Sequence, residues 1–320
     1  MGKDKKIKIS VIGGSGFVGT HLCRKLLSKK INFEIIDKRP TSEFPNHYKY
    51  GDVRDIESLR SVISGDVVVN LAAAHRDDEL DKTEYHRTNV GGAIAISKVC
   101  EEKDIKRIIF TSTVAVYGFA NPGTDESGEI RPFNEYGKSK FEAEEQFRLW
   151  QTRNGNSLIV VRPTAIFGEG NRGNVYNLFK QIATKRFVMI GSGENKKSLA
   201  YIGNVVEFLE FCLSVKEKHI ICNYVDEPNL KIRELVQLVY MKLGINKNPL
   251  KIPFLLALFL GYLMDLFHFF TGVYSPISAI RVRKFTANTE FSSSNSIRKK
   301  FSPPFSLSDG LNVTIEKEFM

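Results

Sequence analysis

The stretch VIGGSGFVG, residues 11–19, restricts the fold more than any other, because it joins a predicted strand to a predicted helix through closely spaced glycines. Gly13, Gly16 and Gly19 have the spacing G-x-x-G-x-x-G. Glycines there permit a tight turn and let the backbone approach a pyrophosphate, and the following helix offers N–H groups and positive dipole character at its N-terminus. The stretch predicts a dinucleotide-binding turn; glycines that serve only a turn are the alternative.

An acidic residue indicates which dinucleotide fits this turn. Asp37 ends the next predicted strand, in NFEIIDKR, at about the distance expected for a carboxylate that binds a ribose 2′-hydroxyl. Such a carboxylate repels a 2′-phosphate, so NAD is favoured over NADP. Lys38 and Arg39 follow at once and could serve a 2′-phosphate, which keeps NADP as the alternative. Asp52 and Val53, in GDVRD, follow a third strand and could contact adenine, or could form a solvated turn.

Short apolar runs alternate with helical patterns through the first half of the chain. The runs IKISVIGG, NFEIIDKR, DVVVNLAA, KRIIFTST and SLIVVRPT read as strands, and the segments between them include helical patterns such as GGAIAISKVCEEK. This alternation implies a parallel sheet covered on both faces. We therefore predict an α/β fold, with a Rossmann-type doubly wound parallel sheet in residues 1–165 to which part of 195–225 returns. Residues 166–320 are predicted to form mainly a smaller C-terminal α/β substrate-binding domain.

The motif YGKSK holds Tyr136 and Lys140 in a Y-x-x-x-K spacing. On a helix these residues share a face, so an ammonium can lie near a phenol and lower the pKa of that phenol toward working pH. The phenolate can then take a proton from a sugar hydroxyl as hydride leaves the same carbon. A second copy, at Tyr176 and Lys180, lies past the last strand of the regular alternation. We interpret Tyr176 as a packing or substrate-contacting residue.

Six motifs, in order along the chain, resemble the extended short-chain dehydrogenase/reductase family, which includes nucleotide-sugar epimerases and dehydratases. They are G-x-x-G-x-x-G, NLAA, the Asn of TNVGG, TST before VAVYG, Y-x-x-x-K and RPTAIFG. The resemblance implies that Thr113 hydrogen-bonds the reacting oxygen, that Tyr136 is acid and base, and that Lys140 lowers the pKa of the tyrosine and binds the nicotinamide ribose. Ser112 is the alternative to Thr113, because adjacent hydroxyls are easily misaligned.

The resemblance also implies which residues contact NAD. Asn89 would have a structural role in its helix, and residues 71–73 would line the cofactor. The expected contacts are Gly13, Gly16, Phe17, Val18, Asp37, Asp52, Val53, Leu71, Ala72, Ala73, Tyr136, Lys140 and Pro163.

The two residues after the implied catalytic threonine indicate the reaction. Sugar dehydratases of this family typically carry Asp-Glu there to eliminate water, whereas this chain has Val114 and Ala115, which have no acid–base capacity. The resemblance therefore implies a 4-epimerase: hydride leaves carbon 4 for NAD, the keto sugar turns over in the site, and hydride returns to the other face. The cofactor is unchanged overall and is expected to stay bound.

Further segments resemble bacterial epimerases that interconvert N-acetylglucosaminyl- and N-acetylgalactosaminyl-diphospho-undecaprenol in surface polysaccharide (O-antigen) synthesis. They are AAAHRDD, FGEGNRGNVYNLFKQIA, SLAYIGNVVEF and NYVDEP. The implied substrate is a lipid-linked sugar diphosphate, and its candidate contacts are His75, Arg76, Asn171, Arg172 and Lys197. Lys197 stands where soluble UDP-sugar epimerases carry an arginine, and lysine lacks the bidentate fork of that residue. The alternatives are a solvated loop for the first two residues and a helix-capping turn for Asn171 and Arg172.

The run IPFLLALFLGYLMDLFHFF, residues 252–270, is the most apolar in the chain. A membrane-spanning helix needs about 20 apolar residues, whereas Asp265 and His268 interrupt this run. Gly261, Asp265, His268 and Gly272 share one narrow helical face, opposite a broad Leu/Phe face. The narrow face can pack on the protein, and the broad face needs a core or a lipid.

A net charge of +10, with basic residues shortly after the run, suits an anionic membrane surface. We predict that segment 252–273 docks in the membrane plane and places the protein on the cytoplasmic face of the bacterial inner membrane, as a peripheral or monotopic protein. A buried core helix, a dimer interface and a true span are the alternatives; the family often forms homodimers.

Other functions fit the sequence less well. The rivals are a soluble UDP-sugar 4-epimerase with the apolar run in its core, a sterol-type NAD-dependent dehydrogenase that needs no diphosphate site, and a non-catalytic NAD-binding protein. Nucleic-acid binding would rest on charge alone, so no nucleic-acid partner is expected. The four cysteines lack metal-site spacing, so we expect buried thiols and no metal.

Overall fold

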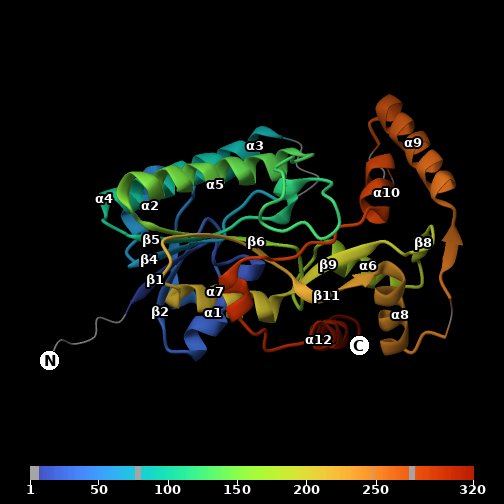
Figure 1. The fold of residues 1–320 in the computed structure, drawn as a ribbon. Helices are drawn as coiled ribbons and strands as arrows, with labels where there is room; N and C mark the ends of the chain where they lie inside the picture. The colour runs from blue at the N-terminus through green and yellow to red at the C-terminus, as the bar shows by residue number, and fades with distance from the viewer. Residues whose placement is uncertain (1–6, 76–80, 247, 274–277) are drawn as a thin grey trace.

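The computed structural model describes residues 7–75, 81–246, 248–273 and 278–320 (Figure 1). Its main sheet has seven strands, all parallel to their neighbours. Their order is β3 (Tyr48–Tyr50), β2 (Asn32–Asp37), β1 (Lys8–Ile12), β4 (Val67–Asn70), β5 (Arg107–Thr111), β6 (Ser157–Pro163) and β10 (His219–Tyr224). The sheet is the doubly wound parallel sheet that the alternation predicted, so the expected fold class is confirmed.

Helices cover both faces of this sheet, because its strands are apolar on both sides. Helices α1 (Phe17–Ser28) and α7 (Ile202–Ser214) lie on one face, and α2 (Ile56–Val62), α4 (Gly92–Glu102) and α5 (Glu135–Asn154) lie on the other. In β1, Ile9 and Val11 pack on the first face and Ile12 on the second. The four cysteines are buried, as expected.

The chain changes direction around β1, and this positions the site. Strands β2 and β3 extend the sheet on one side of β1, and β4, β5, β6 and β10 extend it on the other. In open α/β sheets a ligand binds where the strand order reverses, beyond the carboxyl ends of the strands. Four short helices lie in the connections between strands: η1 (Pro45–His47) directly precedes β3, α3 (Thr83–Tyr85) and η2 (His86–Gly91) lead into α4, and η3 (Val114–Tyr117) follows the carboxyl end of β5.

Two small sheets form the C-terminal part. Strand β9 (Lys196–Tyr201) lies between β11 (Asp226–Lys231) and β7 (Ala165–Phe167), and β12 (Leu250–Ile252) pairs with β8 (Val188–Ile190). Helices α6 (Asn174–Ala183), α8 (Ile232–Lys242) and α12 (Leu307–Phe319) pack on the β7–β9–β11 sheet, whereas α11 (Ser296–Lys300) packs on β10 of the main sheet. The sequence patterns had not shown β8 or β12, because each strand is only three residues long.

The apolar run forms α9 (Phe254–Thr271), which packs on α10 (Ala279–Thr286); we call these two helices the arm (Figure 1). A Cβ on Gly261 would meet Ala279 N at 2.8 Å, so the helices touch closely at this glycine. Ala279 N also donates to Asp265 Oδ2 at 3.0 Å, and Arg283 Nη2 donates to Tyr262 Oη at 2.6 Å. Helix α10 therefore covers part of the narrow face of α9.

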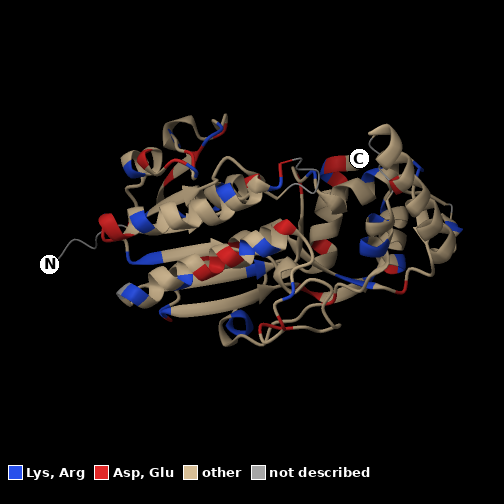
Figure 2. Cartoon of the chain, turned by 90° about the horizontal axis from the view of Figure 1, so that it is seen from above, with Lys and Arg blue, Asp and Glu red and all other residues tan. Residues whose placement is uncertain are grey.

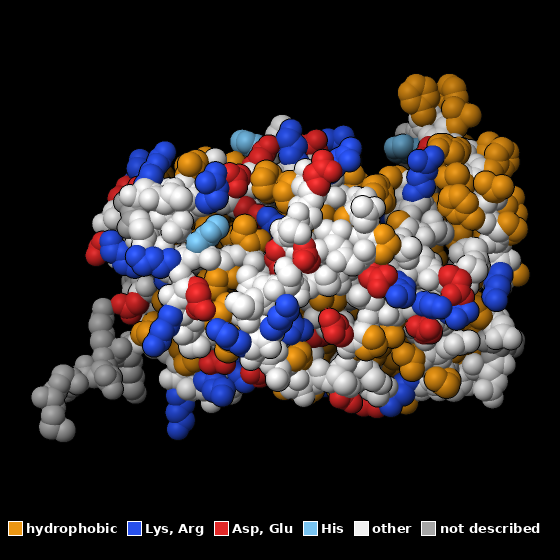
Figure 3. All heavy atoms as spheres, viewed as in Figure 1, with side chains coloured by type: hydrophobic (Ala, Val, Ile, Leu, Met, Phe, Trp, Pro, Cys, Tyr) orange, Lys and Arg blue, Asp and Glu red, His pale blue; other side chains and the backbone are white. Residues whose placement is uncertain are grey.

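The broad face of α9 is exposed. Its exposed large side chains include Leu255, Leu256, Phe259, Leu263, Phe269 and Phe270, and Figure 3 shows apolar side chains gathered over the arm. Within this chain the run is not a core helix, so that alternative is wrong. Helix α9 has one acidic residue and no lysine or arginine, unlike α2, α4 and α5 of the main sheet, each of which carries both charges (Figure 2). By length and composition alone it could span a membrane.

Candidate active site

The glycine turn packs against the end of β4. Gly13 has a left-handed φ of +78°, and a Cβ on it would meet Ala72 N at 2.6 Å. Helix α1 starts after Gly16 without a side-chain cap and without an acidic residue in its first turn. Leu71 N donates to Ile12 O at 2.8 Å, which fixes the β4 end beside the turn. The result is a backbone cradle at a helix N-terminus, open to an anion.

Asp37 lies at the end of β2, beside the glycine turn. Its carboxylate is buried and accepts hydrogen bonds from Ser15 N at 3.1 Å and from Arg39 N at 3.0 Å. Two backbone donors hold the carboxylate in place, and each oxygen keeps a second lone pair for a ribose hydroxyl. Lys38 and Arg39 are exposed next to it.

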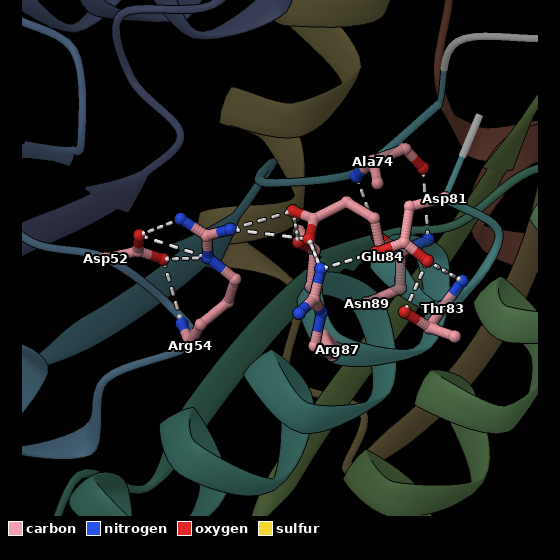
Figure 4. Close-up of polar contacts among 9 residues, drawn as sticks. Asp52, Arg54, Ala74, Asp81, Thr83, Glu84, Arg87 and Asn89 are labelled. Carbon is pink, nitrogen blue, oxygen red and sulfur yellow. Dashed lines mark hydrogen bonds and ion pairs between the residues drawn. The ribbon is translucent and has the colours of Figure 1, made fainter. Parts of the chain in front are cut away.

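Asp52 is paired with a cation in this structure. Arg54 contacts both carboxylate oxygens, with Nη2 2.6 Å from Asp52 Oδ2, and also reaches Glu84 at 3.1 Å (Figure 4). These hydrogen bonds lower the pKa of Asp52. Arg87 in turn contacts Glu84 and Asp81. Asp52 was expected to contact adenine. In this structure it is linked through Arg54 to Glu84, and this link joins the loop after β3 to the segment before α4.

Asn89 ties the loop after β4 to the helix of the Y-x-x-x-K motif. Its side chain accepts from Ala74 N at 2.9 Å and donates to Ala74 O at 3.1 Å (Figure 4). It also donates to Ser139 Oγ at 2.8 Å, and Ser139 Oγ donates to Tyr136 O at 3.0 Å. These bonds confirm the structural role expected of Asn89.

Tyr136 and Lys140 lie in the first turns of α5. Lys140 is only 2% exposed; its Nζ donates to Thr111 O at 2.7 Å and lies 4.2 Å from the centre of the Phe110 ring. Burial lowers the pKa of Lys140 to about 7, against an opposing effect of Glu144. Tyr136 is half-buried. The lysine is therefore held at the carboxyl end of β5, one helical turn from the tyrosine.

The two neighbouring hydroxyls after β5 have different partners. Ser112 Oγ donates to Glu144 Oε1 inside the protein. Thr113 Oγ1 accepts from Ala115 N at 3.1 Å and caps η3, so its own proton remains available to another acceptor.

Ser112 belongs to a buried network that sequence reasoning missed. Glu144 accepts from Arg162 Nε at 2.9 Å and from Arg162 Nη2 at 2.5 Å. Arg162 Nη1 donates to Tyr117 Oη at 2.7 Å, and Tyr117 Oη donates to Asn223 Oδ1 at 2.9 Å. Glu144 follows Lys140 by one helical turn, which is the signal that could have drawn attention to it.

The candidate substrate contacts do not all lie in one place. His75 is exposed, and Arg76 lies outside the described residues. The Asn171 side chain accepts from Gly173 N, as a residue in a turn before α6 would. Arg172 pairs with Glu318 at 2.7 Å, from the C-terminal helix.

Lys197 is engaged by the arm. Its Nζ donates to Lys284 O in the last turn of α10, at 2.9 Å, and to Ala287 O just after that helix, at 2.7 Å. Burial lowers its pKa to about 8. In this structure the lysine therefore anchors α10 to β9.

The second Y-x-x-x-K copy lies apart from the first. Tyr176 stacks on Phe319 with ring centres 5.3 Å apart, and the Arg172 guanidinium lies 4.4 Å from its ring centre. Tyr176 thus has the packing role that was one of its two expected roles.

The model of one protein family matches residues 9–222, which is most of the chain, and its description is NAD dependent epimerase/dehydratase family. The chain belongs to this family. Membership confirms the expected class of enzyme and the expected cofactor, NAD.

Individual relatives within this family are more informative. A protein of Escherichia coli O157:H7 named N-acetyl-alpha-D-glucosaminyl-diphospho-ditrans,octacis-undecaprenol 4-epimerase is 42% identical over 98% of this chain and 95% of its own length. A putative UDP-glucose 4-epimerase of Methanocaldococcus jannaschii is 28% identical over 74% of this chain and 82% of its own. A solved UDP-glucose 4-epimerase of Thermotoga maritima, with UDP-glucose, shares the fold with a TM-score of 0.78 over 97% of this chain and 98% of its own, at 19% identity.

The residues of this epimerase-family chain fit NAD. The glycine cradle leaves no room for a side chain at Gly13, and the Ser15 hydroxyl beside it is buried without a hydrogen-bond partner among the described residues. A buried hydroxyl of this kind matches a phosphate oxygen. Directly after Pro163, at the carboxyl end of β6, the Thr164 hydroxyl is likewise buried and unpartnered within the described ranges. No cluster of metal-ligating side chains occurs in the part of the chain that the structure describes.

Proposed function

We propose that this chain is an NAD-dependent 4-epimerase that interconverts N-acetylglucosaminyl- and N-acetylgalactosaminyl-diphospho-undecaprenol. The observation that carries the proposal is its 42% identity to a relative of that name over nearly the whole of both chains, the apolar arm included. The substrate is then a sugar diphosphate whose lipid tail stays in the membrane.

Three residues are proposed for the chemistry. Tyr136 takes the proton of the sugar 4-hydroxyl and later returns it, while Thr113 donates a hydrogen bond to the same oxygen. A charge on Lys140, one helical turn away, stabilises the phenolate while it exists. When bound, NAD supplies the hydride acceptor and donor for carbon 4. The Asp37 carboxylate and the glycine cradle would hold its ribose and pyrophosphate.

The residues after Thr113 favour epimerisation over elimination. Val114 and Ala115 occupy η3 and cannot transfer protons, so this segment offers no acid to expel a hydroxyl group. The keto sugar is then only reoriented and reduced again. This argument supports a 4-epimerase within a family that also contains dehydratases.

The arm is proposed to dock on the cytoplasmic surface of the bacterial inner membrane. Helix α9 is about 27 Å long at 1.5 Å per residue, close to the hydrocarbon core of about 30 Å. Asp265, near its middle, binds the N-terminus of α10, and α10 carries Arg281, Arg283 and Lys284. A basic helix beside the midpoint of α9 fits an anionic lipid surface and opposes a position across the bilayer. We therefore favour an in-plane, peripheral or monotopic position.

The decisive experiment is a comparison of sugar carriers. The purified protein is incubated separately with N-acetylglucosaminyl-diphospho-undecaprenol in detergent and with UDP-N-acetylglucosamine, and the released sugar is then analysed for N-acetylgalactosamine. We expect epimerisation of the lipid-linked sugar with a kcat/KM at least about 100-fold higher than that of the UDP-sugar. Turnover of the UDP-sugar alone would establish the soluble UDP-sugar epimerase instead. A keto product that accumulates would indicate a dehydrogenase.

A further inference from the structure

Two exposed aromatic rings, Phe119 and Phe133, lie between the proposed catalytic residues and the arm. We propose that this pair, which we call the aromatic platform, binds the first isoprene units of the substrate tail and leads the tail from the diphosphate to the membrane. The inference rests on the proposed function, because only a lipid-linked substrate has such a tail.

The platform is a built feature of the surface. The two rings stack with centres 4.6 Å apart and an interplanar angle of 29°, although Phe119 is 52% and Phe133 is 39% exposed. Arg131 N donates to Val116 O at 3.0 Å, which joins the two loops that carry the rings. Gly118 has a φ of +67°, and a Cβ on it would collide with Arg131 O. The loops are therefore fixed against each other at the base of the stack.

Each ring lies on the same short segment as one proposed catalytic residue. Phe119 follows Thr113 across the single turn of η3. Phe133 precedes Asn134, which caps α5 by accepting from Gly137 N at 2.9 Å, and Tyr136 lies in the first turn of that helix. A substrate oxygen held between Thr113 and Tyr136 would thus be bound by residues that are close in sequence to both rings.

The platform also touches the arm. Lys284 Nζ of α10 lies 5.1 Å from the centre of the Phe133 ring. The carbonyl of Lys284 accepts from Lys197 Nζ, so this end of α10 is anchored to β9. At its other end α10 packs against Gly261 of α9. Through α10 the platform is therefore linked to the arm, and Figure 1 shows the arm standing beside the loops that follow β5.

An isoprenoid tail suits this surface for physical reasons. The tail has no hydrogen-bonding groups, so its affinity must come from removal of apolar area from water. Rigid aromatic rings offer a large contact area at a small cost in side-chain entropy. A tail that left the site through water would instead expose its first units on every turnover. The sugar ring is the rival occupant, because aromatic faces also pack on sugars.

The test distinguishes binding of the tail by the platform from binding of the membrane and from binding of the sugar. Two water-soluble substrates are compared without lipid or detergent: N-acetylglucosaminyl diphosphate esterified to farnesol, whose tail can reach the platform, and the same diphosphate esterified to methanol. The measured quantity is the ratio of their kcat/KM values. The variants are Phe119→Gln with Phe133→Gln, the apolar pair Phe119→Leu with Phe133→Leu, and Met241→Gln as an exposed control on α8.

We expect the wild type to prefer the farnesyl ester by about tenfold, which corresponds to about 1.4 kcal/mol. The glutamine pair should reduce this ratio to about one, while the leucine pair and Met241→Gln retain most of it. Each single glutamine variant, checked for retained NAD, gives the same test should the pair fold poorly.

Three results would overturn the inference. The first is a wild type without a preference for the farnesyl ester, and the second is a ratio that the glutamine pair leaves unchanged. The third is an equal loss on both esters in the glutamine variants that retain NAD, because that loss would assign the rings to the sugar. All three leave the proposed epimerase standing, whereas activity on UDP-N-acetylglucosamine alone would remove the proposed function itself.

Discussion

The hydroxyl of Ser112 donates a hydrogen bond to the buried carboxylate of Glu144. Glu144 is also paired with Arg162, so Ser112 is part of the buried network that supports the site. The adjacent Thr113 accepts only a backbone N–H in the bonds that the structure shows, and its proton can reach a substrate oxygen. This geometry favours Thr113 over Ser112 as the hydroxyl that acts on substrate.

Thr113→Val should therefore lower kcat by roughly 10²-fold, the usual loss for one donor to a reacting oxygen, while NAD remains bound. Thr113→Ser, which keeps the hydroxyl and the cap of η3, should restore most of the rate. Ser112→Ala should instead reduce the free energy of unfolding by about 1.5–3 kcal/mol, because a buried charged group loses a hydrogen bond. Steady-state rates and thermal unfolding distinguish the two, and a reversed pattern would assign the chemistry to Ser112.

Tyr136→Phe should lower turnover by roughly 10²-fold or more, since it removes the general acid and base. Its matched control is Tyr176→Phe, which keeps the stacking on Phe319 and leaves the rate within a few-fold of the wild type. NAD content, measured by absorbance after denaturation, should be normal in both. Equal losses of rate in the two variants would contradict the choice between the two Y-x-x-x-K copies.

Asp37→Ser should weaken discrimination against NADP. The carboxylate that repels a 2′-phosphate is removed, and Lys38 and Arg39 are already exposed beside the site. The ratio of the dissociation constants of the two cofactors, measured by calorimetry on protein stripped of cofactor, should move toward NADP by about tenfold or more. A wild type that already binds NADP more tightly would refute the argument.

Lys140→Met should raise stability, and the gain should depend on pH. The pKa of Lys140 is about 7 in the folded protein and 10.5 for an ordinary lysine. Between these values the unfolded chain binds a proton here that the folded chain does not, so the wild type becomes more stable as the pH rises through this range. The methionine variant lacks this dependence, and its advantage is largest below pH 7 and disappears near 10.5.

Denaturant unfolding at about pH 6 and about pH 9 measures this effect. One pKa unit corresponds to about 1.4 kcal/mol, so the advantage of Lys140→Met should shrink by on the order of 1–3 kcal/mol between the two conditions. A difference that does not change with pH would show that Lys140 is not desolvated in solution. Turnover should be lost in this variant at either pH.

Leu256→Glu with Leu263→Glu should release the protein from membranes without unfolding it. Both leucines lie on the exposed face of α9, and a charge opposes insertion of that face into the acyl region, at a cost that reaches about 2.5–3.5 kcal/mol at the bilayer centre. The matched control is Leu27→Glu with Met241→Glu, which adds the same charge at exposed apolar positions outside the arm. Vesicle flotation with anionic lipids should retain the control and lose the variant, with NAD binding normal in both.

Other outcomes would reassign the arm. Wild-type protein that resists extraction by carbonate would indicate a helix that spans the bilayer. The protein could instead form a dimer that does not bind vesicles. If the two glutamates dissociate that dimer, the exposed face of α9 contacts a second copy of this chain.

The sequence by itself determined those features that depend on neighbouring residues. The spacing of Gly13, Gly16 and Gly19 and the alternation of strands with helices predicted the doubly wound sheet, because tight turns and periodic burial are written into short segments. The same holds for α9, whose narrow face was visible in the spacing of Gly261 and Asp265.

Only the tertiary structure decided which distant groups meet. Ser112 bonds Glu144 across 32 positions, and Arg172, expected near the substrate, pairs with Glu318 across 146. Lys197, expected at a diphosphate, bonds the end of α10 across 87 positions or more. A charged or hydroxyl side chain can form hydrogen bonds or ion pairs with any of several partners. Packing of the whole chain determines which of these partners it meets. That selection leaves no trace in the local sequence.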